Sequence, residues 1–142
     1  NYGFYGETEY DRVQIDMLQE EAYDYRNKIV QTAYTLGDSY PDAFADFSNN
    51  AVPRHVDGFE NFLASRPDKA HFVGDKLSLA DFVIYELMWQ TRLMLPDSIS
   101  ESSRPHLNAF VDQFSRRPLI AAYMQSQDYI ERPINSPWAS FA

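Results

Sequence analysis

The segment that begins at Ser78 constrains the fold most, because it predicts a helix that is apolar on nearly every face. Ser78 is a favourable N-cap, and Asp81 stands three positions later, where its carboxylate can accept a hydrogen bond from the Ser78 amide and complete a capping box. From Leu79 to about residue 94, only Asp81 and Glu86 are charged before Arg92. A helix without a polar face belongs inside a bundle and not on its surface. We therefore assign Ser78 and Asp81 to folding, as a structural cap, and expect other helices to surround this one.

The rest of the chain has the patterns of those surrounding helices. Helical stretches are predicted at residues 7–35, 41–65, 105–115 and 119 to about 127. Gly37 is expected at the C-cap of the first of them. Pro53 lies inside the second, which predicts a kink there or two shorter helices end to end. Because no stretch alternates like a strand, the sequence predicts an all-α bundle of five or six helices.

The composition excludes several classes of protein. A chain of 142 residues suits one domain, and its 44% of apolar residues can form a real core. The net charge of −9 disfavours both nucleic acid and an anionic membrane surface as partners. No run approaches the roughly 20 apolar residues of a membrane span. The absence of cysteine excludes disulfides, thiolate metal sites and cysteine nucleophiles.

The residues show no self-contained catalytic motif. His55, His71 and His106 are isolated, and none is paired with another histidine or a carboxylate at the helical spacing of metal ligands. There is neither a glycine-rich phosphate loop nor a nucleophile elbow. We therefore predict no metal site, and the pattern alone indicates a soluble helical domain.

Four segments resemble the C-terminal domain of glutathione transferases. Residues 6–9 (GETE), which open the long first helix, are similar to the start of that domain in the Mu class. Residues 72–82 (FVGDKLSLADF) resemble the central motif of the family, an aromatic residue followed by GDK and a Ser/Thr-x-x-Asp cap. Residues 120–126 (IAAYMQS) and 132–134 (RPI) resemble the final helix and tail of the Mu class. The central motif is shared across classes and with non-enzyme relatives, whereas the opening and closing segments point to Mu.

The resemblance covers essentially the whole chain and implies one helical domain over residues 1–142. Residues 1–6 would be a lead-in from a preceding domain, and residues 128–142 an irregular tail over the bundle. In this family, a preceding thioredoxin-like domain binds most of the glutathione and supplies the tyrosine that stabilises its thiolate. Nothing here resembles that domain, and the chain begins at Asn1 without Met. We interpret this as a cut inside a longer protein, although processing would give the same start, and expect the isolated chain to fold but to be inactive.

The resemblance also implies roles for residues of the first helix. Asp24 matches an aspartate that reaches across the dimer to the amino group of glutathione, and Tyr34 matches a tyrosine whose hydroxyl assists at the electrophile site. Tyr23 occupies a position that lines this site, eleven residues before Tyr34 and therefore on the same helical face. The ordinary alternatives are a solvated acid for Asp24 and helix packing for the tyrosines, the latter being the stronger interpretation of Tyr23.

In the tail, Ser136 matches a hydroxyl-bearing position over the electrophile pocket, with Ile134 and Asn135 beside it. The alternative is a disordered C-terminus. Asn135 replaces an apolar residue common in relatives, which would make that wall of the pocket more polar.

The function implied by the resemblance is conjugation of glutathione to small apolar electrophiles, a detoxification reaction. Glutathione would be a co-substrate, no cofactor would be bound permanently, and the parent protein would be a cytoplasmic homodimer. Because fold does not fix function, two alternatives stay open. One is a non-catalytic structural or assembly module, and the other is a carrier that only binds ligands.

Overall fold

The computed structural model describes residues 3–140, which form helices and connecting loops and contain no strand. Its six α-helices are α1 (Glu9–Ala33), α2 (Tyr40–Asp46), α3 (Val52–Ala64), α4 (Leu79–Met94), α5 (Pro105–Ser115) and α6 (Pro118–Met124). Short 3-10 turns cover Gly37–Ser39 and Pro96–Ser98, and a π turn covers Phe47–Ala51. The prediction of an all-α bundle of five or six helices is confirmed.

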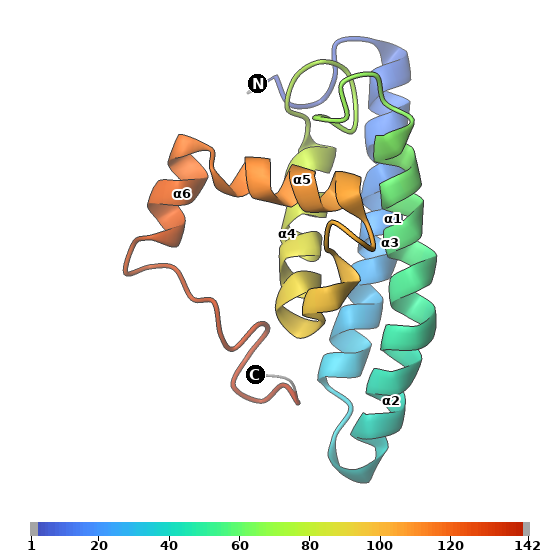
Figure 1. Cartoon of the computed structure of the whole chain (residues 1–142), viewed down its shortest axis with the longest axis vertical. Coiled ribbons are helices and arrows are strands. Elements are labelled where there is room, and N and C mark those ends of the chain that lie inside the picture. The colour runs from blue at the N-terminus through green and yellow to red at the C-terminus, as the bar shows by residue number, and fades with distance from the viewer. Residues whose placement is uncertain (1–2, 141–142) are drawn as a thin grey trace.

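Helix α4 lies at the centre of the bundle, packed against α1 and α5, while α6 stands apart on one side (Figure 1). Ile84, Leu87 and Met88 of α4 are fully buried. This position explains why the sequence of α4 lacks a polar face, since neighbours cover most of its surface. None of the helices in the described part of the chain is both long and apolar enough to cross a bilayer.

The N-terminus of α4 is completed by a buried carboxylate. Asp81 accepts hydrogen bonds from the Phe72 amide (2.8 Å), the Ser78 amide (2.7 Å) and the Ser78 hydroxyl (2.8 Å). The first amide of the helix, that of Leu79, donates to the Phe4 carbonyl (2.9 Å). Burial raises the pKa of the Asp81 carboxyl, and the hydrogen bonds from Phe72 and Ser78 oppose that rise. This network ties the loop before α4 and the N-terminal segment to the helix.

The region around Pro53 contains two helices end to end, α2 and α3, joined by the π turn. In that turn the Val52 amide donates to the Phe47 carbonyl, five residues back. The wider turn places Pro53 in the first turn of α3, where a proline is well tolerated.

The prediction that Gly37 caps the first helix is wrong. Helix α1 ends at Ala33 with Tyr34 as its C-cap, and Gly37 begins the following 3-10 turn with a φ of +63°. A glycine is not needed at the helix end because the last carbonyls find other partners. The Thr35 hydroxyl donates to the Gln31 carbonyl, and the amide of Ser140 in the C-terminal tail donates to the Ala33 carbonyl.

Candidate functional site

The C-terminal tail is fixed at the ends of two helices. The Ser140 amide donates to the Ala33 carbonyl (2.7 Å), and the Ser140 hydroxyl donates to the Thr35 carbonyl (2.6 Å), which completes the end of α1. The Arg132 guanidinium donates to the Leu93 carbonyl (2.8 Å) at the end of α4, where the helix dipole favours a positive charge. The tail between residues 132 and 140 therefore runs from the end of α4 to the end of α1.

This course of the tail brings together two of the residues singled out in the sequence. The Tyr34 hydroxyl donates to the Ser136 hydroxyl oxygen (3.2 Å), although 102 positions separate them in the chain. The same oxygen accepts from the Trp138 amide (3.2 Å). Ser136 donates its own hydroxyl proton to none of residues 3–140, and Tyr34 is 47% exposed. The pair thus offers a hydroxyl donor at an open surface.

Tyr23 does not reach this pair. It is exposed and lines a shallow depression of about 430 Å³ beside Arg26 and Val83. Eleven residues of helix place Tyr23 about 16 Å from Tyr34 along the axis of α1. Asp24 is also exposed on α1, and its carboxylate makes no hydrogen bond or ion pair with any residue from 3 to 140.

The two other tail residues differ in their surroundings. Asn135 is exposed, and its side chain bonds to nothing within residues 3–140. Ile134 is partly buried and lines a groove of about 410 Å³ between α4, α6 and the tail. Ile134 therefore belongs to a different surface from the Tyr34–Ser136 pair.

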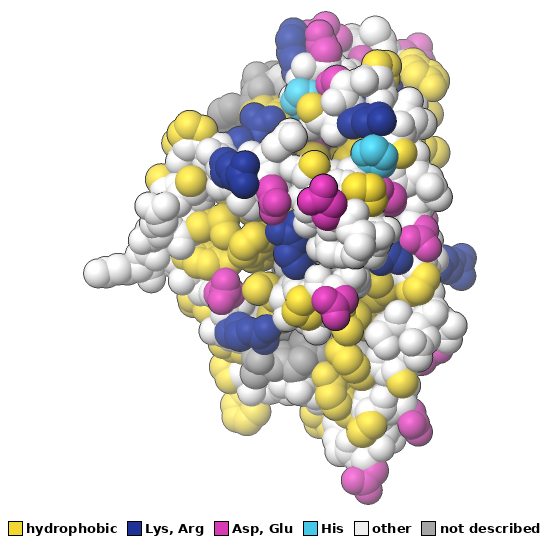
Figure 2. Space-filling view, in the orientation of Figure 1, with side chains coloured by type: hydrophobic (Ala, Val, Ile, Leu, Met, Phe, Trp, Pro, Cys, Tyr) yellow, Lys and Arg dark blue, Asp and Glu magenta, His cyan; other side chains and the backbone are white. Residues whose placement is uncertain are grey.

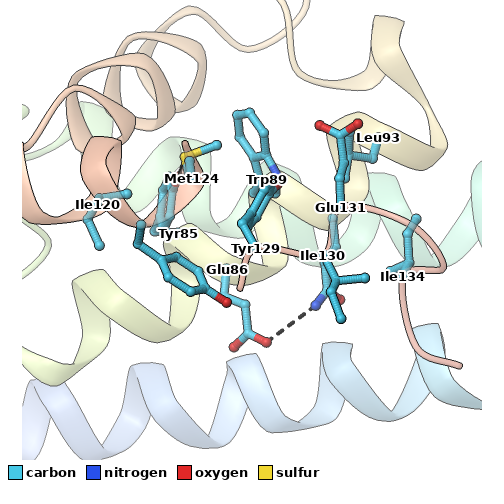
Figure 3. Close-up of a pocket in the computed structure, with 12 residues that line it drawn as sticks. Tyr85, Glu86, Trp89, Leu93, Ile120, Met124, Tyr129, Ile130, Glu131 and Ile134 are labelled. Atoms are coloured by element: carbon cyan, nitrogen blue, oxygen red, sulfur yellow. Dashed lines mark hydrogen bonds between the residues drawn. The ribbon is translucent and has the colours of Figure 1, made fainter. Parts of the chain in front are cut away.

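The sequence analysis did not predict this groove. Figure 3 shows Trp89 and Tyr129 side by side, with Ile120 and Met124 of α6 toward one end and Ile130 and Ile134 of the tail toward the other. In Figure 2, hydrophobic side chains gather in the hollow between the main bundle and α6. The sequence predicts Trp89 in an apolar helix and Tyr129 in an irregular tail, and no local pattern indicates that these two side chains are in contact.

Two of the three histidines have carboxylate partners. His55 is buried, and its Nδ1 lies 2.6 Å from the Glu21 carboxylate, 34 positions away. His71 lies 3.1 Å from Asp68 in the loop before α4. These are isolated pairs, and no group of three histidine, aspartate or glutamate side chains suited to a metal ion occurs within residues 3–140.

Comparisons with known proteins agree on one family. Residues 23–127 match the model described as "Glutathione S-transferase, C-terminal domain". Glutathione S-transferase Mu 1 of Oryctolagus cuniculus is 30% identical, over 94% of this chain and 57% of the relative. Glutathione S-transferase P of Capra hircus is 31% identical, over 94% of this chain and 61% of the relative. The chain thus spans about three fifths of the length of these curated relatives.

Solved structures show the same fold. The structure of the Onchocerca volvulus Pi-class glutathione S-transferase superposes with a TM-score of 0.84 at 25% identity, covering 97% of this chain and 64% of that one. Sequence similarity and fold therefore lead to the same group of proteins, in both the Mu and the Pi classes.

Proposed function

Because this chain belongs to the glutathione S-transferase family, as a C-terminal domain, we propose that it serves a parent enzyme that conjugates glutathione to small apolar electrophiles. Glutathione is the co-substrate in this proposal, and no cofactor is bound permanently. The observation that carries the proposal is the hydroxyl pair of Tyr34 and Ser136, which the tail holds at an open surface.

The chemistry requires a thiolate and a way to stabilise the charge that its attack creates. The thiolate sulfur forms a bond to the electrophile, and negative charge moves onto an electronegative atom of that substrate. A hydroxyl donor near that atom stabilises the developing charge. In this proposal Ser136 donates to that atom, and Tyr34 assists, because its hydroxyl donates to the Ser136 oxygen. Asn135 stands next to Ser136 in the tail, and Ile134 and Tyr23 line neighbouring surfaces from which they would contact a bound electrophile. The residue that activates the thiol lies outside this chain, so the chain alone is inactive.

Asp24 has a separate role in the proposal. A carboxylate that is exposed, with no partner among residues 3–140, is free to pair with an external cation. We assign it to the ammonium group of a glutathione bound by a second subunit in a homodimer. A charge-assisted hydrogen bond of this kind is worth roughly 1.5–3 kcal/mol.

The proposal also covers the transferase class of the parent protein and its location in the cell. We assign the parent to the Mu class because the opening and closing segments resemble that class, although its relatives also include Pi-class proteins. Conjugation of small apolar electrophiles is a detoxification reaction, and the parent would carry it out in the cytoplasm.

The test is a conjugation assay with glutathione and a chlorinated dinitrobenzene, on the full-length parent protein and on the 142-residue chain. Turnover by the full-length protein alone supports the proposal. No turnover by either protein favours the structural or ligand-binding module. Turnover by the short chain alone would contradict the assignment of the thiol-activating residue to another domain.

A further inference from the structure

Asn135 differs from the other asparagines of residues 3–140 in the backbone around it. It lies in the irregular part of the tail, outside the helices and the π turn. The others lie in α1, the π turn, α3 or α5: Asn27, Asn49, Asn50, Asn61 and Asn108. In those elements, hydrogen bonds between peptide groups hold the backbone on both sides of the asparagine. Within residues 3–140, Asn135 is therefore the asparagine that no such ladder restrains.

The peptide bond between Asn135 and Ser136 has the features that favour deamidation. Asn135 is exposed, and its side chain bonds to no residue from 3 to 140, so it can turn toward its own backbone. The Ser136 amide donates no hydrogen bond to these residues either. The serine side chain is small and leaves that amide nitrogen open to attack. Asparagine is a thermolabile residue, and these surroundings leave Asn135 unprotected.

Deamidation at this position consumes only water. The Ser136 amide nitrogen loses its proton to hydroxide and attacks Cγ of Asn135. A bond forms between these atoms, while the bond from Cγ to the side-chain nitrogen breaks and that nitrogen leaves as ammonia. Water then opens the resulting cyclic imide at either of its carbonyls. The product is aspartate or isoaspartate, and each carries a negative charge that asparagine lacks.

We propose that Asn135 is a site of spontaneous deamidation, which places a carboxylate next to Ser136. The Ser136 hydroxyl oxygen accepts from the Tyr34 hydroxyl (3.2 Å) and from the Trp138 amide (3.2 Å), and its own proton is donated to none of residues 3–140. The new charge therefore arises beside a free hydroxyl donor. Asn135 does not line the groove between α4, α6 and the tail, so the reaction does not depend on whether that groove is open.

The consequence for catalysis rests on the proposed function. A carboxylate at position 135 competes with an electrophile for the Ser136 proton and opposes the negative charge that develops on that electrophile. Isoaspartate also adds a carbon atom to the backbone just before Ser136, which shifts Ser136 relative to Tyr34. Deamidation therefore lowers the turnover of the parent enzyme as the protein ages.

The test follows the full-length parent protein during incubation at neutral and at moderately alkaline pH. Conversion at each asparagine is measured by mass spectrometry of peptides, which requires no enzyme activity. Asn49 and Asn50 are the matched controls, because they are also exposed but lie in the π turn. We expect Asn135 to react on the order of tenfold faster, because the turn must open before its asparagines react. The rate should rise with pH, because the attacking nitrogen must lose its proton.

Two variants connect the modification to the site. Asn135→Gln keeps a side-chain amide but requires a larger ring, so its turnover should not decline during the same incubation. Asn135→Asp carries the product from the start and should lower turnover about threefold in a protein whose circular dichroism shows native helicity. Asn61→Asp adds an equal charge in α3, outside the Tyr34–Ser136 site, and should leave turnover unchanged.

No conversion at Asn135, or conversion at the same rate as Asn49 and Asn50, would overturn the proposal. Equal turnover in Asn135→Asp and the unmodified protein would overturn the assigned effect on Ser136. If the full-length protein turned over no electrophile, the proposed function would fail, whereas the mass measurement would still decide for or against deamidation at Asn135.

Discussion

The N-terminus of α4 and the C-terminus of α1 are both completed by residues from elsewhere in the chain, but their surroundings differ. At α4, the fully buried Asp81 accepts three hydrogen bonds from Phe72 and Ser78. At α1, Ser140 completes the helix end, and the neighbouring Tyr34 is 47% exposed. Water cannot replace the partners at the buried end, whereas it can at the exposed end. The first end therefore contributes to stability, and the second leaves polar groups available to a ligand.

The largest change in the free energy of unfolding is expected on replacing Asp81, at the buried end of α4. Replacement by alanine leaves the buried amides of Phe72 and Ser78 without acceptors, and we expect the free energy of unfolding to fall by about 3 kcal/mol. Urea denaturation followed by circular dichroism measures this. Asp81→Asn keeps one acceptor oxygen and should lose less. A loss below about 1 kcal/mol for Asp81→Ala would contradict the stabilising role of this end.

A smaller effect, dependent on pH, comes from another buried polar contact between α1 and α4. The Tyr25 hydroxyl lies 2.7 Å from the Thr91 hydroxyl oxygen, and burial raises the pKa of Tyr25 above its ordinary value of 10.0. Above pH 10 the unfolded chain releases this proton more readily than the folded one. The stability present below pH 10 should therefore fall as the pH rises, by about 1.4 kcal/mol per pH unit from this group.

Denaturation curves between pH 9 and pH 11 test this prediction. Tyr25→Phe should lose about 1 kcal/mol at neutral pH and show a shallower decline above pH 10. Tyr10→Phe, at a tyrosine that is 68% exposed on the same helix, serves as the control. If the free energy of unfolding fell equally steeply with pH in Tyr25→Phe and Tyr10→Phe, Tyr25 would not be the cause of the decline above pH 10.

The smallest effect on global stability is expected at the exposed end. Ser140→Pro removes both hydrogen bonds of Ser140 to the end of α1, and the free energy of unfolding should change by less than about 0.5 kcal/mol. The tail should nevertheless be cleaved faster in limited proteolysis, because its anchor is lost. Ser140→Ala, which loses only the hydroxyl bond, should lie between this variant and the unmodified chain. Unchanged cleavage in Ser140→Pro would contradict the anchoring role of the residue.

The same contrast explains how much could be predicted from the sequence. The predicted span of α4 agrees with the observed Leu79–Met94, because a local cap and an apolar run determine it. The C-cap at Gly37 was wrong because partners from Thr35 and Ser140 complete α1 earlier. The latter contact spans more than 100 positions and leaves no local pattern.

The residues of the candidate site also differ in whether the sequence could predict where they lie. Tyr34 and Ser136 were singled out through the family resemblance and meet in the structure, whereas Tyr23 lies in a different depression of the surface. The aromatic groove was missed, because the contact between Trp89 and Tyr129 depends on how the tail returns to α4.

The most direct test of the central claim, that the Tyr34–Ser136 pair assists an electrophile, is a double-mutant cycle in the full-length protein. Turnover of several electrophiles would be compared for Tyr34→Phe, Ser136→Ala and the double variant, with Tyr10→Phe as the control. We predict a loss of about tenfold for Tyr34→Phe with electrophiles that develop charge on oxygen, little added loss in the double variant, and unchanged stability. Turnover unaffected by Tyr34→Phe across all electrophiles would contradict the claim.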